Sequence, residues 1–193
     1  MKKLKFYLIH YLQSIFIKRF FEKIRANELV LKDVQHYFEL RGCNPAKKSD
    51  FDRFKHLMKY YPEFVFIFHW RTGLLSDRLK SLFRHPGYEC KIFKSTKIGG
   101  GLSCFHPFAT VINAKSIGEN FEFRNGLTIG NKNNDNQLIP VIGDNVTVGA
   151  NVCIIGKINV GNNVIIGAGS VVVKDVPDNV IVAGSPARII RRL

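Results

Sequence analysis

The sequence predicts a mostly β protein, a left-handed parallel β-helix with an α-helical N-terminal cap. Two observations lead to this fold class. The chain after residue 88 repeats every six residues, and a short fixed period is typical of stacked coils. Before that point, apolar residues recur at spacings of three and four, as in amphipathic helices. We therefore expect two domains, a helical cap over residues 1–88 and a β-helix over residues 89–193 that ends in a short tail.

The cap is expected to contain four helices. The spacing of apolar residues predicts the first over 3–28 and the second over 30–40. A serine in an N-cap position predicts a third over 49–60, and a fourth is expected over 64–83. The apolar face of the first helix predicts a packing partner, in the cap or in another subunit. Its basic and aromatic residues leave a second interpretation open, a helix that lies on a membrane surface.

The six-residue repeat is most regular from Ile142, where the hexads read IGDNVT, VGANVC, IIGKIN, VGNNVI, IGAGSV and VVKDVP. The first position holds Ile or Val almost throughout, and such β-branched side chains are expected to fill the interior. The fourth position is nearly always Asn or Gly. These residues tolerate a positive φ, so we expect a sharp turn there. The fourth-position residues are Gly101, Asn120, Gly126, Asn145, Asn151, Asn163 and Gly169.

Composition and charge exclude several function classes. The formal net charge is +14, and residues 1–88 hold most of it, with 18 Lys and Arg against 8 Asp and Glu. Such a charge attracts nucleic acid, anionic membranes or phosphorylated ligands, but no nucleic-acid-binding motif accompanies it, so we expect no nucleic-acid partner. Four widely spaced cysteines predict neither a disulfide framework nor a zinc site. We expect a cytoplasmic protein, with the basic cap as a peripheral contact to the inner face of the membrane.

Three segments of the repeat domain carry a family resemblance: IGGGLSCFHPFATVIN, the run VIGDNVTVGANVCIIGKINVGNNVIIGAGSVVVKDVP and the ending VAGSPARII. They resemble the hexapeptide-repeat acyltransferases, and within them the branch of serine acetyltransferase-like enzymes and polysaccharide O-acetyltransferases. The resemblance covers about residues 89–193. It implies acetyl-CoA as the co-substrate and a homotrimer with active sites between its subunits.

The resemblance implies a catalytic histidine at His106, the third position of the hexad that follows IGGGLS. Imidazole is a suitable general base near neutral pH. In the hexad phase Cys104 points into the interior, so His106 is expected to face outward. The family's carboxylate that orients this histidine falls at Lys91, and Glu89 on the same strand face is the candidate to replace it. Because the coils contain a single histidine, no metal site is expected.

The resemblance also implies a groove for acetyl-CoA along the coil edges. Small residues would let the pantetheine arm approach the backbone, and cations would bind the nucleotide phosphates. Tight coil turns and a solvated tail explain the same residue types equally well. The small residues are Gly149, Ala150, Gly167 and Ala168, and the cations are Lys174 and Arg188.

Departures from the serine acetyltransferase pattern predict the acceptor. Those enzymes have an Asp immediately before the catalytic histidine, whereas Phe105 stands here. Their Arg-His pair in the following loop is missing from the insertion 130–140, GNKNNDNQLIP, which we expect to form an external loop. We therefore predict an acetyl-CoA-dependent O-acetyltransferase that acts on a sugar hydroxyl of a surface polysaccharide or its precursor. Serine O-acetyltransferase of cysteine biosynthesis is the alternative, and a non-catalytic scaffold is a third class.

Overall fold

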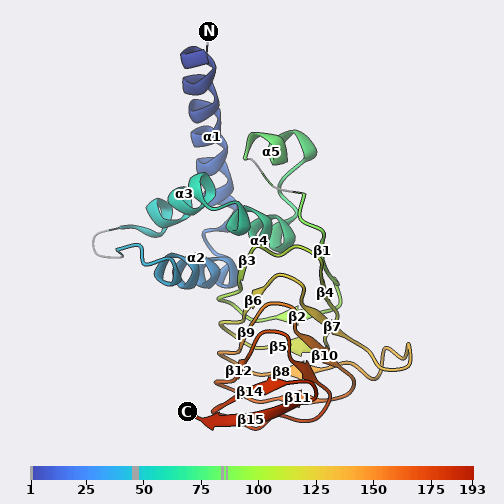
Figure 1. Cartoon of the computed structure of the whole chain (residues 1–193). Helices are drawn as coiled ribbons and strands as arrows, with labels where there is room; N and C mark the ends of the chain where they lie inside the picture. Colours follow the sequence, from blue (N-terminus) through green and yellow to red (C-terminus); the bar gives the residue numbers. More distant parts are fainter. Residues whose placement is uncertain (1, 45–47, 84, 86) are drawn as a thin grey trace. The chain divides into compact units, whose positions relative to one another are not determined.

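The computed structural model describes residues 2–44, 48–83, 85 and 87–193, with side chains from residue 7 onward. The chain divides into two compact units, Met1–Gly87 and Tyr88–Leu193 (Figure 1). The first unit is helical, and the second is built from short strands.

Five helices form the described part of the first unit. The Asn27 side chain accepts a hydrogen bond from the backbone N of Val30 (3.2 Å) and caps α2. The Ser49 hydroxyl accepts one from the backbone N of Asp52 (3.2 Å) and caps α3. The bounds are α1 (Lys2–Ile24), α2 (Glu28–Leu40), α3 (Asp50–Tyr60), α4 (Pro62–Thr72) and α5 (Asp77–Leu82).

The expectation of a single helix over 64–83 is wrong. Helix α4 ends at Thr72 because Gly73 has a φ of 65°, the left-handed conformation of a glycine C-cap. Helix α5 begins only after Ser76. The apolar spacing continues across this break, and for that reason it predicted one helix in place of two.

Aromatic rings form much of the core of the helical unit. The Phe54 ring lies 5.3 Å from the Phe68 ring and 6.2 Å from the Phe64 ring, centroid to centroid. Arg71 in α4 donates to both carboxylate oxygens of Asp33 in α2, over 2.6 and 3.1 Å, and both side chains are buried. A buried charge without its partner is costly, so this pair ties α2 to α4.

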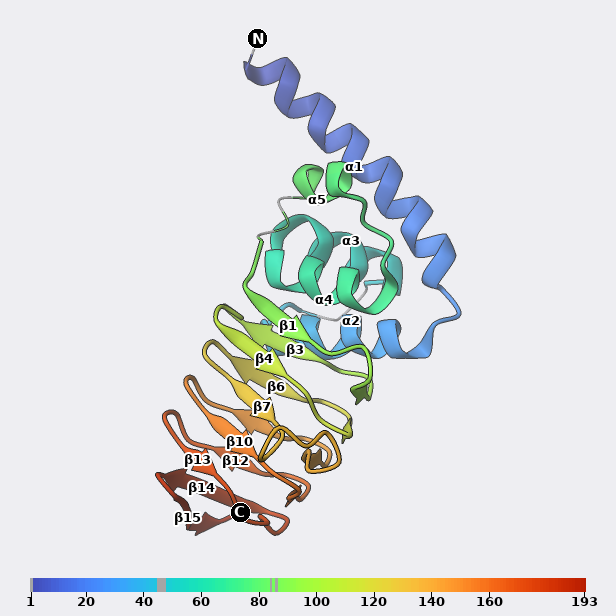
Figure 2. The ribbon, with the colours of Figure 1, turned by 90° about the vertical axis from the view of Figure 1, so that its right-hand side faces the viewer.

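The second unit is a β-helix with parallel sheets, which confirms the predicted architecture, while its left-handedness stays a prediction. Three sheets form its sides, in the orders β1-β4-β7-β10-β13, β11-β8-β5-β2 and β15-β14-β12-β9-β6-β3. Figure 2 shows the first of these sheets stacked along one side. Strands of successive coils pair in parallel, and β15 folds back antiparallel on β14.

The strands are two to six residues long, with turns between them. Their bounds are β1 (Cys90–Ile92), β2 (Lys97–Ile98), β3 (Ser103–Phe105), β4 (Thr110–Ile112), β5 (Ser116–Ile117), β6 (Glu122–Arg124), β7 (Thr128–Gly130), β8 (Val141–Ile142), β9 (Thr147–Val148), β10 (Cys153–Ile155), β11 (Asn159–Val160), β12 (Ile165–Ile166), β13 (Val171–Val172), β14 (Val180–Gly184) and β15 (Ala187–Arg192).

The hexad positions have the predicted roles. All seven fourth-position residues have a positive φ, between 54° and 83°. The first-position side chains of the regular hexads are each exposed by 2% or less, so they fill the interior as expected. These side chains are Ile142, Val148, Ile154, Val160, Ile166 and Val172.

A ladder of asparagine side chains runs along one corner of the β-helix. Asn120 donates to Asn145 (2.9 Å), Asn145 to Asn163 (3.0 Å) and Asn163 to Asn179 (2.8 Å). Each member also has a positive φ. The ladder therefore stabilises the corner in two ways: asparagine tolerates the positive φ of the turn, and the side-chain amides form hydrogen bonds between coils.

We expect Asn145→Ala to lower the free energy of unfolding by about 2–3 kcal/mol, from left-handed strain and lost hydrogen bonds together. Asn145→Gly is the matched control, because glycine keeps the positive φ at low cost and loses only the amide. Urea unfolding of the two variants measures the difference. Equal losses would show that the positive φ of Asn145 contributes nothing to stability.

Candidate active site

His106 stands at a corner of the β-helix, where β3 ends and the chain turns toward β4. Cys104 in β3 is fully buried, whereas His106 is exposed, as the hexad phase predicts. The imidazole is therefore available to a substrate at the surface of this unit.

The His106 turn is longer than the corresponding turns of later coils. Strand pairing aligns Phe105 with Arg124 before the turn and Val111 with Thr128 after it. Between these pairs the His106 coil has two more residues than the next coil. Because of this extra length, the backbone N of Gly126 donates to the carbonyl of Phe108 (2.9 Å), two residues beyond His106, which the register aligns with Asn125.

The extended turn places two residues in the left-handed region, since His106 and Ala109 both have a φ of 50°. Neither residue is glycine or asparagine, so each costs roughly 1–2 kcal/mol. Strained backbone of this kind concentrates at functional sites. The turn geometry therefore supports a functional hypothesis for His106 that is independent of any family likeness.

His106 lies on the same edge as two of the predicted small residues. The strand register, continued past the paired residues, aligns His106, Asn125, Ala150 and Ala168 in successive coils. The backbone N of Gly169 donates to the carbonyl of Ala150 (2.8 Å), which supports the last step. We call this row of four residues the His106 edge. At roughly 4.8 Å per coil it runs ~14 Å from Ala168 to His106.

The two glycines beside this edge are explained by coil packing. A Cβ added to Gly149 would lie 2.5 Å from the backbone N of Ala168. A Cβ added to Gly167 would lie 3.0 Å from the Cβ of Ala183. Gly149 and Gly167 thus allow close stacking of the coils. Ala150 and Ala168 keep large side chains off the adjoining edge.

Beside His106 the small residues give way to larger side chains. The Arg124 guanidinium lies 4.7 Å from the centre of the Phe105 ring and 3.4 Å from the Glu122 carboxylate. Phe105 and Arg124 are paired in register with Gly149 and Gly167 of the later coils. Arg124 was not among the predicted site residues, although it stands in FRNGLT at the position where most other hexads have Gly.

An aromatic pair and the candidate carboxylate lie at the other end of the turn. The rings of Tyr88 and Phe108 meet edge to face with centroids 4.9 Å apart. Glu89 is exposed, and its carbonyl accepts a hydrogen bond from the backbone N of Thr110 (3.0 Å). This bond places the Glu89 backbone beside Thr110, at the far end of the turn that begins at His106. Burial raises the pKa of the neighbouring Cys90 thiol to about 12, so this thiol is protonated at neutral pH and a poor nucleophile.

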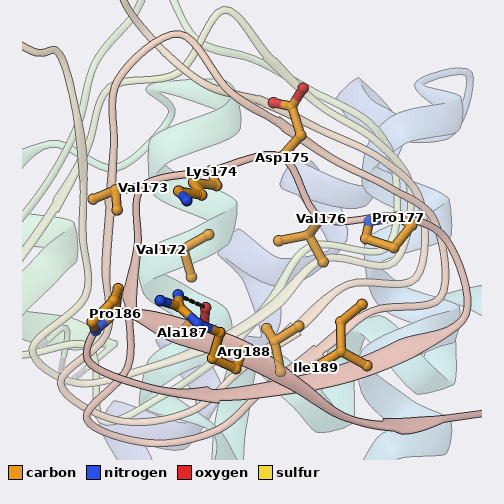
Figure 3. Close-up of a pocket in the computed structure, with 11 residues that line it drawn as sticks. Val172, Val173, Lys174, Asp175, Val176, Pro177, Pro186, Ala187, Arg188 and Ile189 are labelled. Carbon is orange, nitrogen blue, oxygen red and sulfur yellow. Dashed lines mark hydrogen bonds between the residues drawn. The ribbon is translucent and has the colours of Figure 1, made fainter.

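The two candidate cations for CoA lie together near the last coil. Lys174 and Arg188 line one cavity of about 60 Å³ with Pro186 and Ile189 (Figure 3). The Arg188 guanidinium donates to the carbonyl of Ala187 (3.0 Å). The cavity holds a small group at most, so these side chains would act at a surface rather than enclose a nucleotide.

The insertion forms an external loop, as predicted, and it has structure of its own (Figure 1). The backbone N of Lys132 donates to the carbonyl of Leu138 (3.2 Å), and Asn131 donates to Asn136 (2.9 Å). Cavities of about 630 and 430 Å³ lie between loop residues and the coils. Asn133 lines the second of them together with Ile155.

In the part of the chain that the structure describes, no helix is both long enough and apolar enough to cross a bilayer. No group of three or more His, Cys, Asp or Glu side chains is placed to bind a metal ion there.

Sequence comparisons identify acetyltransferases, although no protein-family model matches the chain. The putative colanic acid biosynthesis acetyltransferase WcaB of Escherichia coli (strain K12) is 48% identical over 104 residues, 53% of this chain and 63% of the relative. A serine acetyltransferase of Synechococcus elongatus is 36% identical over 120 residues, 61% of this chain and 46% of the relative. The chain thus spans less than two thirds of the length of these relatives.

Structural comparisons give the same answer. The serine acetyltransferase of Neisseria gonorrhoeae matches with a TM-score of 0.62 and 28% identity, over 87% of this chain and 67% of the other. A serine acetyltransferase from Brucella abortus in complex with coenzyme A matches with a TM-score of 0.57 and 27% identity, over 88% and 70%.

The second unit is thus a parallel β-helix of six-residue repeats with an exposed histidine at one edge. The similar proteins indicate which class of enzyme this arrangement resembles. The chain is similar in sequence to WcaB and to serine acetyltransferases, and it shares the fold of solved serine acetyltransferases.

Proposed function

We propose that this protein transfers the acetyl group of acetyl-CoA to a sugar hydroxyl of a surface polysaccharide or its precursor. The observation that carries the proposal is the His106 edge, where an exposed histidine with a strained backbone lies in line with the small side chains of Ala150 and Ala168. Relatives named as acetyltransferases, one of them for colanic acid biosynthesis, support the reaction class.

In this proposal His106 is the general base. It removes the proton of the acceptor hydroxyl while that oxygen bonds to the acetyl carbonyl carbon. The tetrahedral intermediate then loses the C–S bond, and the departing thiolate takes the proton from His106. Glu89 is proposed as the positioning residue for the imidazole, because it lies at the same turn and a carboxylate would favour one ring orientation.

Acetyl-CoA is proposed to bind along the His106 edge, beside Gly149, Ala150, Gly167 and Ala168, with Lys174 and Arg188 toward its phosphates. A homotrimer would place this edge between two subunits. Serine O-acetyltransferase remains the alternative, since serine acetyltransferases are among the structural matches.

We propose a cytoplasmic location, where the four cysteines, which form no disulfide with one another, would stay reduced. Helix α1 supports a peripheral membrane contact, because it exposes Tyr7, Leu8, Tyr11 and Ile15 among basic residues. Sedimentation with anionic vesicles, before and after Tyr11→Glu, tests this contact.

Ala168→Trp should weaken acetyl-CoA binding at least tenfold, because a large ring on the His106 edge would occupy the path of the pantetheine arm. The fold should survive, since Ala168 is exposed. Calorimetry with acetyl-CoA measures the affinity, and Lys157→Trp is the control, because Lys157 is exposed at another corner and has no positive φ. Unchanged binding by a folded Ala168→Trp variant would rule out this position for the donor, and no binding by the wild type would favour a scaffold.

A further inference from the structure

The helical unit contains a cationic cavity outside the proposed acetyl-transfer site. It has a volume of about 300 Å³ and opens along one face of α3. We call it the α3 pocket. Its lining residues are Lys48, Asp52, Lys55, His56, Lys59 and Tyr60.

The α3 pocket has an excess of positive charge. Three lysines face a single carboxylate, Asp52, which already accepts a hydrogen bond from the Ser49 hydroxyl (2.6 Å). Within the described part of the chain neither Lys55 nor Lys59 forms an ion pair, although both are partly buried. Three lysines beside one carboxylate leave the pocket with a net positive charge, which indicates a place for an anion.

The electrostatics of the pocket agree with its geometry. Burial, and then the neighbouring Lys55, lower the pKa of Lys59. Burial, and then Lys48, lower the pKa of His56. The positive charges of the pocket thus repel one another, and a bound anion would relieve this repulsion.

Aromatic rings form one wall of the α3 pocket. The His56 ring lies 5.0 Å from the Tyr60 ring and 5.7 Å from the Phe38 ring, centroid to centroid. His56 is held from behind, because its Nε2 lies 3.7 Å from the Cys43 sulfur. Tyr60 is 64% exposed, so one face of its ring is open to a flat or ring-shaped group.

We propose that the α3 pocket binds a phosphate or diphosphate group, with Lys55 and Lys59 as its main contacts and Tyr60 against an attached ring. Flexible ammonium groups suit phosphate as adaptable point charges. A phosphorylated soluble molecule and a phosphorylated lipid headgroup share this chemistry. The site is independent of the proposed acetyl transfer, because every residue in it belongs to the helical unit.

Calorimetric titration of the full chain with pyrophosphate and with uridine diphosphate tests the proposal. Both probes should bind saturably, and Lys55→Gln/Lys59→Gln should weaken both at least tenfold, as two charge-assisted contacts would be lost. The matched control is Lys94→Gln/Lys97→Gln, two exposed lysines of the β-helix unit, which removes the same charge outside the pocket and should change affinity less than twofold. Tyr60→Ala should weaken uridine diphosphate more than pyrophosphate.

A second arm distinguishes the source of the phosphate. Phosphatidylcholine vesicles with and without phosphatidic acid are sedimented with the same variants. Binding to phosphatidic acid vesicles alone, lost in the Lys55→Gln/Lys59→Gln variant and kept in the Lys94→Gln/Lys97→Gln variant, would identify a lipid headgroup. Saturable binding of the soluble probes alone would identify a soluble ligand. Equal losses in both double variants, or no saturable binding of any probe, would overturn the proposal.

Discussion

Replacing His106 should lower kcat for acetyl transfer by ~10²–10⁴, the usual loss when a general base is removed. Its φ of 50° decides which variant to make. Alanine at this position would keep the left-handed strain, whereas asparagine tolerates the conformation. His106→Asn therefore removes the base and keeps the turn, and His106→Ala serves as the second variant.

The affinity for acetyl-CoA and the oligomer mass should stay nearly unchanged in His106→Asn, because the imidazole acts on the acceptor proton rather than on the donor. Calorimetry and light scattering measure these two quantities, and thiol release from CoA measures turnover. Glu89→Gln is the companion variant, and its smaller loss of kcat should be accompanied by a shifted pH profile if Glu89 positions the imidazole. Full activity of a folded His106→Asn protein would place the base elsewhere.

The repeat made the fold predictable, because each hexad position has its own steric requirement. Asn145 and Gly169 could be assigned a positive φ from sequence because few other residues adopt one cheaply. The same logic placed Cys104 inside and His106 outside. In the helical unit no such repeat exists, and the apolar spacing across Gly73 hid a helix end that only the glycine could have indicated.

The candidate site was less predictable than the fold. The hexad pattern gives the column of a residue but not the length of a turn, so the two additional residues after His106 were not foreseen. The hexad that contains Arg124 looks merely irregular in the sequence, but strand pairing brings the Arg124 guanidinium onto the Phe105 ring. Contacts between coils depend on which residues align across 19 positions of chain, from Phe105 to Arg124, and the period alone does not fix that alignment once turns vary in length.

The acceptor is expected to be a sugar rather than serine, and the charges beside His106 supply the reason. A free amino acid is bound through its charges, so a serine site needs a carboxylate for the ammonium group. Here Phe105 occupies the matching position, and the neighbouring Glu122 carboxylate is already paired with the Arg124 guanidinium (3.4 Å), which lies 4.7 Å from the Phe105 ring. Aromatic surface at Phe105 and neutral amides such as Asn133 and Asn134 in the external loop suit a sugar face and its hydroxyls.

We therefore expect kcat/KM for L-serine to be lower than that for a glycan or nucleotide-sugar acceptor by about 10³ or more, since a missing polar contact in a binding site costs several powers of ten in discrimination. Thiol release from acetyl-CoA measures both reactions. Phe105→Asp is the matched variant, because it supplies the absent carboxylate and should raise the serine reaction while lowering the sugar reaction. A steady serine-dependent signal in the wild type at millimolar serine, abolished in His106→Asn, would overturn the sugar acceptor and establish the serine alternative, because the same base would then act on an amino-acid hydroxyl.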